Sequence, residues 1–150
     1  MNLRNEAVTI LVAEDDPDDR LLLQDAMAEV RLANPIEFVR DGRELLDYLR
    51  CENDYAGRSP RLPGILLLDL NMPRMDGREA LKAIKSDIAL KQIPVVVLTT
   101  SKAEEDIVRS YDLGVNSFVS KPVNFMQFVS MMSALTDYWL EYVSLPPTEE

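Results

Sequence analysis

Short apolar runs alternate with segments of helical periodicity along the chain. The apolar runs occupy residues 8–13, 36–39, 65–70, 94–99 and 117–120. Three of them (VTILVA, ILLLDL and PVVVLT) are almost continuous in valine, isoleucine and leucine, whereas a strand with one exposed face would alternate with polar residues. This pattern predicts strands that are buried on both faces, as in a parallel sheet covered by helices.

The segments that follow these runs predict helices. The first begins near Pro17, and the others span residues 42–52, 77–87, 103–113 and 124–142. Asp16 is expected to cap the first helix, because a short acidic side chain before a first-turn proline is typical of a helix start. The buried side of this helix is expected to contain Leu21, Leu22, Met27 and Val30. Strands alternating with helices over short connections predict an α/β fold with a doubly wound sheet.

Five polar residues lie at the predicted strand ends. Glu14 and Asp15 follow the first strand, Asp69 lies near the end of the third, Thr99 ends the fourth and Lys121 follows the fifth. A single acidic residue after a strand is usually a helix cap or a solvated loop residue. Ligands of doubly wound sheets, however, bind beyond the carboxyl ends of the strands. We therefore expect these five side chains to converge on one pocket.

Three carboxylates in one pocket repel each other by about 3 kcal/mol per pair at ~5 Å and an effective dielectric of ~20. Without a cation, one of them is expected to bind a proton more readily than usual. Mg²⁺ suits such a site because it prefers oxygen ligands, although Lys121 alone is the simpler counter-charge. An aspartate beside Mg²⁺ can act as a nucleophile toward phosphorus, with Lys121 and Thr99 contacting the phosphoryl oxygens.

The composition excludes several classes of protein. Acidic residues outnumber basic ones by 26 to 16, and the resulting net charge of −10 disfavours binding to nucleic acids and to anionic membranes. The absence of histidine excludes Ser-His-Asp catalysis and His-ligated metal sites. A cytoplasmic location is expected, because the chain has a lone cysteine (Cys51), no apolar stretch that could span a bilayer and no signal-peptide pattern.

Four segments together resemble the receiver domain of bacterial two-component response regulators. They are ILVAEDDP (10–17), LLLDLNMPRMDG (66–77), PVVVLTTS (94–101) and SFVSKP (117–122). The resemblance implies one receiver domain over residues 1–150, without an output domain. It also implies a flavodoxin-like (βα)5 sandwich with a five-stranded parallel sheet of order 2-1-3-4-5. The implied activity is that of a phosphoacceptor switch, not of an enzyme with outside substrates.

The resemblance assigns roles around the acidic residues. Asp69 matches the phosphoacceptor. Asp15 matches a direct Mg²⁺ ligand, Glu14 a residue that reaches the metal through water, and Asn71 the position whose backbone carbonyl binds the metal. Asn71 and Ser101 also occupy positions that tune the phosphoryl lifetime in the family.

The resemblance further implies a switch around the phosphoryl group. Thr99 and Lys121 match the hydroxyl and the amine that contact this group, and Phe118 matches a rotating aromatic switch. The Lys121–Pro122 peptide bond is expected to be cis, as in the family. Thr100 departs from the small residue that the family prefers, so its bulk is expected to narrow access to the phosphoryl group.

Two further features narrow the resemblance. The segment 50–63 is longer than in a minimal receiver and is expected to be a surface loop, and residues 138–150 form a C-terminal extension. Both are similar to the response regulators of bacterial and cyanobacterial phytochromes. This implies a phytochrome-type sensor histidine kinase as the donor, and a homodimer. Dimer contacts are expected from Trp139, Leu140, Tyr142, Val143 and Leu145, unless this tail folds back onto its own domain.

Three alternatives differ in the residues that they require. A haloacid-dehalogenase-type phosphatase needs a second aspartate two residues after the nucleophile, where this chain has Asn71. A flavin-binding module needs a phosphate-binding loop after the first strand, where the acidic sequence EDDPDD would repel phosphate. A scaffold that works without phosphorylation needs a broken acceptor site, and none of the five strand-end positions is broken.

Overall fold

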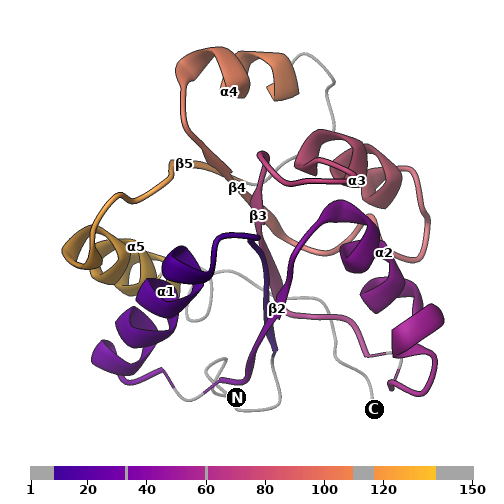
Figure 1. Cartoon of the computed structure of the whole chain (residues 1–150), viewed down its shortest axis with the longest axis horizontal. Coiled ribbons are helices and arrows are strands. Elements are labelled where there is room, and N and C mark those ends of the chain that lie inside the picture. Colours follow the sequence, from indigo (N-terminus) through magenta and orange to yellow (C-terminus); the bar gives the residue numbers. More distant parts are fainter. Residues whose placement is uncertain (1–8, 33, 60, 110–116, 138–150) are drawn as a thin grey trace.

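The structure, a computed structural model, describes residues 9–32, 34–59, 61–109 and 117–137. Within these ranges strands and helices alternate (Figure 1). The elements are β1 (Ile10–Ala13), α1 (Pro17–Glu29), β2 (Ile36–Val39), α2 (Gly42–Arg50), a 3-10 turn η1 (Asn53–Tyr55), β3 (Ile65–Asp69), α3 (Gly77–Lys85), β4 (Val95–Thr99), α4 (Lys102–Arg109), β5 (Ser117–Ser120) and α5 (Phe125–Asp137).

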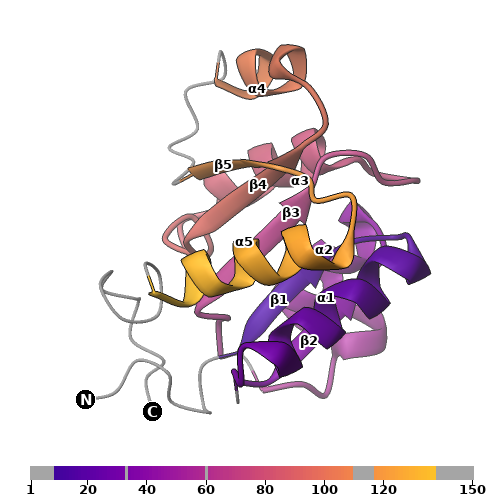
Figure 2. The same ribbon diagram turned by 90° about the vertical axis from the view of Figure 1, so that its left-hand side faces the viewer.

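The strands of the described residues form one parallel sheet in the predicted order β2-β1-β3-β4-β5. Helices α1 and α5 cover one face, and α2, α3 and α4 cover the other (Figures 1 and 2). The chain runs outward from β1 to β2 and then returns to β3 on the other side of β1. The strand order therefore reverses between β1 and β3, which is where ligands bind in sheets of this type.

Two apolar layers enclose the sheet. Leu11 and Ala13 of β1 pack with residues of α2 and α3, whereas Ile10 and Val12 pack with residues of α1 and α5. Every residue of β1, β3 and β4 is buried, and exposed positions are found in the edge strand β2. The prediction of strands buried on both faces is confirmed for the three central strands, because successive side chains point to opposite faces and both faces are covered.

Aspartates begin three of the helices. The side chain of Asp16 accepts a hydrogen bond from the backbone N–H of Asp18, as predicted, and Asp41 caps α2 through the N–H of Glu44. Asp76 forms a reciprocal capping box with Glu79 at the start of α3. Each cap satisfies a backbone donor that lacks a partner within the helix.

The predicted buried side of α1 is partly wrong. Leu21 is 57% exposed, whereas Leu23, Ala26 and Met27 are buried. The rotation of α1 about its axis is set by its packing against the sheet and α5. The residues of α1 alone do not contain this information. The predicted ends of α4 and α5, the C-terminal extension and all five expected dimer contacts lie wholly or partly outside the described residues.

The segment after α2 is exposed over most of its described length, as predicted, but side chains anchor it to α2. The Arg58 guanidinium lies 3.8 Å from the Tyr48 ring centre and donates to the Tyr48 carbonyl from Nε (3.1 Å) and Nη2 (2.7 Å). Tyr55 packs edge-to-face on Tyr48, and its hydroxyl donates to Glu44. None of the helices in the described ranges is long and apolar enough to cross a membrane.

Candidate functional site

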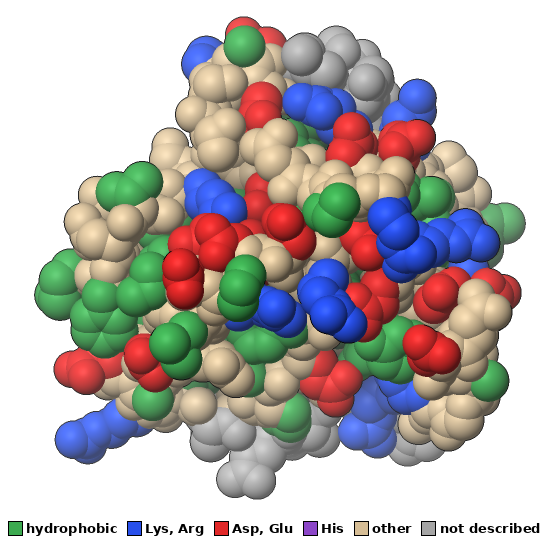
Figure 3. Space-filling view, in the orientation of Figure 1, with side chains coloured by type: hydrophobic (Ala, Val, Ile, Leu, Met, Phe, Trp, Pro, Cys, Tyr) green, Lys and Arg blue, Asp and Glu red, His purple; other side chains and the backbone are tan. Residues whose placement is uncertain are grey.

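The sheet brings the five strand-end residues together, as predicted. Asp69 and Thr99 are the last residues of β3 and β4, and Glu14, Asp15 and Lys121 follow β1 and β5 directly. The register pairs Ala13 with Leu68, Asp69 with Leu98 and Thr99 with Ser120, so the neighbouring strands end at nearly the same level. Figure 3 shows acidic side chains gathered on this face between α1 and α4, with basic side chains among them.

The acidic side chains of the site are unusually buried. Glu14 is 3% exposed and Asp69 is 1% exposed, and Asp15 is half-buried. One ligand atom from each of these three carboxylates lies within 4.8 Å of the others. Carboxylate oxygens at this spacing are suitable ligands for a divalent cation. Their combined negative charge exceeds the positive charge around them, which also favours such an ion.

Lys121 is the cation at the centre of this cluster. Its Nζ lies 2.8 Å from Asp69 Oδ2, 3.0 Å from Glu14 Oε1 and 3.0 Å from Asp19 Oδ2. Asp19 was not predicted as a site residue. The only signal for it in the sequence is its position one helical turn after Asp15, in the acidic first turn of α1.

The surroundings of Glu14 and Lys121 shift the pKa values of both groups upward, for different reasons. Burial, followed by the negative charge of Asp69, raises the pKa of Glu14 from 4.5 to about 7, although Lys121 and the Asp16 N–H oppose this shift. The direction agrees with the easier protonation predicted for one carboxylate of the cluster, but burial contributes more to it than repulsion by Asp69 does. Burial acts to lower the pKa of Lys121, but hydrogen bonds to Asp69, Glu14 and Asp19 raise it overall, so the ammonium stays charged.

The Lys121–Pro122 peptide bond is trans, so the expectation of a cis bond is wrong for this structure. Even before proline the trans form is favoured by about 0.5–1 kcal/mol. From the trans backbone the Lys121 ammonium already reaches three carboxylates, and its N–H donates to the Thr99 carbonyl at 2.8 Å.

The loop between β3 and α3 closes tightly over Asp69. The backbone N–H of Asn71 donates to Asp69 Oδ1 at 3.0 Å, which orients the carboxylate. Gly77 donates to the Leu70 carbonyl, and a Cβ atom at Gly77 would lie 2.5 Å from the Asp69 carbonyl oxygen. Glycine is therefore required here because of the close approach of two backbone segments.

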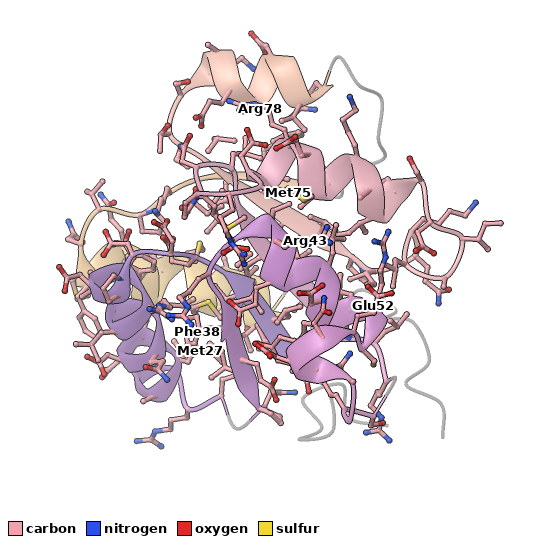
Figure 4. All side chains as sticks on the ribbon, turned by 45° about the vertical axis from the view of Figure 1, so that its right-hand side comes forward. Met27, Phe38, Arg43, Glu52, Met75 and Arg78 are labelled. Atoms are coloured by element: carbon pink, nitrogen blue, oxygen red, sulfur yellow. The ribbon has the colours of Figure 1, made fainter. Side chains whose placement is uncertain are left out.

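Contacts to α2 hold the same loop from its outer side. Arg74 donates to Asp41 through Nε (2.8 Å) and Nη2 (3.1 Å), and the N–H of Gly42 donates to the Met75 carbonyl at 2.7 Å. Figure 4 labels Met75 in this loop. The first residues of α2 thus fix the path of the segment that carries Asn71, the expected carbonyl ligand.

Phe118 lies in β5, half-buried beside the apolar layer of α2, α3 and α4. The Arg109 guanidinium of α4 lies 4.3 Å from the centre of its ring, and Arg109 is in turn paired with Glu105 at 2.6 Å. A cation over an aromatic face is attracted by the ring quadrupole. The predicted aromatic switch is therefore in contact with α4.

Ser101, predicted to tune the phosphoryl lifetime, begins α4. Its hydroxyl oxygen accepts a hydrogen bond from the N–H of Glu104 at 3.1 Å. The Glu104 carboxylate accepts hydrogen bonds from Thr100, the residue before Ser101. The N–H of Thr100 donates at 2.8 Å and its hydroxyl at 3.0 Å. Glu104 was not predicted as part of this site, although a serine followed three residues later by a glutamate is a sequence signal for a helix start.

Comparisons with known proteins agree with this geometry. The family model of the response regulator receiver domain matches residues 10–133. The response regulator Rcp1 of Synechocystis sp. is 40% identical over 142 residues, which cover 95% of this chain and 95% of that protein. The crystal structure of the phosphorylated cyanobacterial phytochrome response regulator RcpA has a TM-score of 0.83 and 44% identity, covering 94% of this chain and 99% of its own. The Mn²⁺-bound form of Rcp1 has a TM-score of 0.81 and 38% identity, with 93% and 99% covered.

Proposed function

Because this chain belongs to the family of response regulator receiver domains, we propose that Asp69 accepts a phosphoryl group from a sensor histidine kinase in a Mg²⁺-dependent reaction. Proteins of this family are signalling switches of two-component systems. The observation that carries the proposal is the buried Asp69 carboxylate, which lies within 4.8 Å of the carboxylates of Glu14 and Asp15 and is paired with Lys121.

The proposed transfer is a displacement at phosphorus. A carboxylate oxygen of Asp69 forms the new P–O bond while the bond from phosphorus to the donor breaks, and the donor leaves with that electron pair. These 150 residues contain no histidine, so a phosphohistidine donor lies outside this sequence. The Asn71 N–H orients the acceptor carboxylate, and Lys121 and the Thr99 hydroxyl are proposed to pair with phosphoryl oxygens, because Lys121 is paired with Asp69 and Thr99 ends the neighbouring strand.

The residues that would hold Mg²⁺ are Glu14, Asp15, Asp69 and the backbone carbonyl of Asn71. Bound there, the ion supplies positive charge that offsets the negative charge of the carboxylates and of the transferred group. The single positive charge of Lys121 is shared among Glu14, Asp19 and Asp69, so the protein's own counter-charge does not complete the neutralisation. We expect the metal-free protein to be a poor acceptor for this reason.

The switch is proposed to pass from Thr99 to Phe118. A phosphoryl group on Asp69 adds negative charge and acceptor oxygens beside the end of β4. If the Thr99 hydroxyl turns toward it, the Phe118 ring gains room to turn inward, and its contact with Arg109 changes. The outcome is a population shift of the surface formed by α4, β5 and α5.

The direct test is intact mass after incubation with acetyl phosphate, with and without Mg²⁺. Wild type is expected to gain one phosphoryl group in the presence of Mg²⁺, and Asp69→Asn to gain none. Asp25→Asn, which makes the same chemical change at an exposed position of α1, is the matched control and is expected to behave as wild type. Equal labelling of wild type and Asp69→Asn would overturn the assignment of the acceptor.

The donor is proposed to be a histidine kinase of the phytochrome type. The proposal rests on the likeness to Rcp1 and to the phytochrome response regulator RcpA over nearly the whole chain. The test compares phosphotransfer from purified phytochrome kinases in red and far-red light with transfer from kinases that lack a phytochrome sensor. Equal transfer rates from all of these kinases would contradict a phytochrome-type partner.

The alternative of a scaffold that works without phosphorylation receives no support from the geometry. A scaffold would have no use for a buried acceptor carboxylate, a lysine paired with it and two further carboxylates at metal-ligand spacing, which together carry a cost in desolvation.

A further inference from the structure

The carboxylate of Glu104 is tied to the residue that follows Thr99. In an ordinary capping box, the acidic residue at the third helical position would accept the N–H of the cap residue, here Ser101. Instead, Glu104 Oε1 accepts both the N–H (2.8 Å) and the hydroxyl (3.0 Å) of Thr100. The Ser101 hydroxyl still accepts the Glu104 N–H, so the start of α4 is fixed from both directions.

The same carboxylate also contacts the elements that follow Asp69. The Asn71 side chain is hydrogen-bonded to Glu104, and Arg78 Nη2 lies 3.8 Å from Glu104 Oε2. Arg78, labelled in Figure 4, extends from α3 toward α4. Glu104 thus joins the β4–α4 loop to the β3–α3 loop, and its side chain is only 14% exposed.

Both Thr100 donors bond to the carboxylate of Glu104, and hydrogen bonds to a charged acceptor are about twice as strong as neutral ones.

Thr100 directly follows Thr99, the residue proposed to contact the phosphoryl group, at the same edge of the sheet as Asp69. Thr99 is the last residue of β4, and β4 is hydrogen-bonded to the strand that ends in Asp69. A phosphoryl group on Asp69 would bring a second set of anionic acceptors to this edge of the sheet. While Glu104 occupies the N–H and the hydroxyl of Thr100, neither donor is available to that group.

We infer that Glu104 is a positioning residue that competes with the phosphoryl group for the donors of Thr100 and so holds the β4–α4 loop in its unphosphorylated arrangement. The inference rests on the proposed function of Asp69. Glu104 sets how readily the site passes into its phosphorylated form, because a contact made in one state alone shifts the equilibrium toward that state. It contacts no reacting atom.

The test measures binding of beryllium trifluoride, a phosphoryl mimic that does not transfer, in the presence of Mg²⁺. Loss of one hydrogen bond to a charged group corresponds to a change in affinity of about tenfold. We expect Glu104→Ala to bind the mimic about tenfold more tightly than wild type, and Glu104→Gln, which keeps the size and one acceptor oxygen, to lie between them. Asp106 of the same helix is 62% exposed and is paired with Lys102, so Asp106→Ala and Asp106→Asn are matched controls, expected within about twofold of wild type.

Hydrogen exchange of the Thr100 amide, measured without the mimic, gives a readout that does not depend on phosphorylation. This amide is expected to exchange faster in Glu104→Ala than in wild type, while the amides of β4 exchange at unchanged rates if the fold is intact. Mimic binding that is unchanged or weaker in Glu104→Ala would overturn the inference and leave the function of Asp69 standing. Failure of wild type itself to bind the mimic would overturn the proposed function, and this inference with it.

Discussion

Lys121 illustrates at the scale of single residues why the site requires a further cation. Among the described residues, its ammonium is paired with Glu14, Asp19 and Asp69, and the Asp15 carboxylate lies beside the same cluster. Four carboxylates therefore surround one positive charge. Burial, and secondly the charge of Asp69, raise the pKa of Glu14 to about 7.

This shift predicts how the stability of the metal-free protein depends on pH. The pKa of Glu14 is higher in the folded protein (about 7) than its ordinary value of 4.5, so the folded state binds more protons between these values. The stability that this group contributes is complete below pH 4.5 and is lost as the pH rises through 7. Glu14→Gln is expected to remove this loss and to be more stable than wild type by about 1–3 kcal/mol at mildly alkaline pH.

Urea unfolding at a series of pH values, in the presence of a chelator, measures this effect. Asp25→Asn removes one negative charge from an exposed position of α1 and serves as the control, expected to keep the slope of wild type. Parallel pH profiles for wild type and Glu14→Gln would show that Glu14 does not carry the shifted proton.

At the scale of elements, the β3–α3 loop is held in place by contacts with two other elements, α2 and the end of β3. The Asp41–Arg74 ion pair and the bond from Gly42 to Met75 hold it against α2, and Gly77 places it against the end of β3. The loop carries Asn71, whose N–H orients the Asp69 carboxylate. A displacement of this loop would therefore also move the Asp69 carboxylate.

Gly77→Ala is the sharpest test of this packing. The new Cβ would lie 2.5 Å from the Asp69 carbonyl oxygen and 2.7 Å from the Leu70 Cα, and backbone atoms in a buried strand cannot move aside cheaply. We expect a loss of about 1–3 kcal/mol in the free energy of unfolding, together with slower phosphorylation by acetyl phosphate. Gly57→Ala is the matched control, because no heavy atom lies within 4 Å of a Cβ at that position. Equal effects of the two substitutions would contradict the role of the close approach.

For the whole molecule, the site couples ion binding to folding. The ligands come from segments as far apart in sequence as Glu14 and Asp69, and only the folded sheet brings them together. An ion that binds the folded state and not the unfolded chain must stabilise the fold by mass action. Because the net charge is −10, salts also stabilise the protein by general screening, and the two effects have to be separated.

The free energy of unfolding of wild type is expected to rise by about 1.4 kcal/mol for each tenfold increase in Mg²⁺ above the dissociation constant. Urea titrations at constant ionic strength, balanced with NaCl, measure this slope. Asp15→Asn removes one ligand of the cluster and is expected to shift the rise to higher Mg²⁺, whereas Asp25→Asn is expected to leave it unchanged. Equal stabilisation by Mg²⁺ and by NaCl at matched ionic strength would contradict specific binding of Mg²⁺ at this cluster.

The sequence by itself determined the positions of the strands, the α/β class, the Asp16 cap and the convergence of Glu14, Asp15, Asp69, Thr99 and Lys121, whereas the strand order followed from the resemblance to receiver domains. The periodicity of apolar residues is local information, and parallel strands necessarily end at the same edge of their sheet. Polar residues that follow such strands are therefore placed together before any side-chain contact is known.

Only the tertiary structure decided which way the helices face and which side chains meet between loops. In the folded protein Leu21 is exposed, Asp19 joins the Lys121 cluster, and Glu104 contacts Asn71 and Arg78. The structure also contradicted the cis bond expected at Lys121. The rotation of a helix about its axis and the path of a loop follow from packing against residues far away in the chain, so no local pattern contains them.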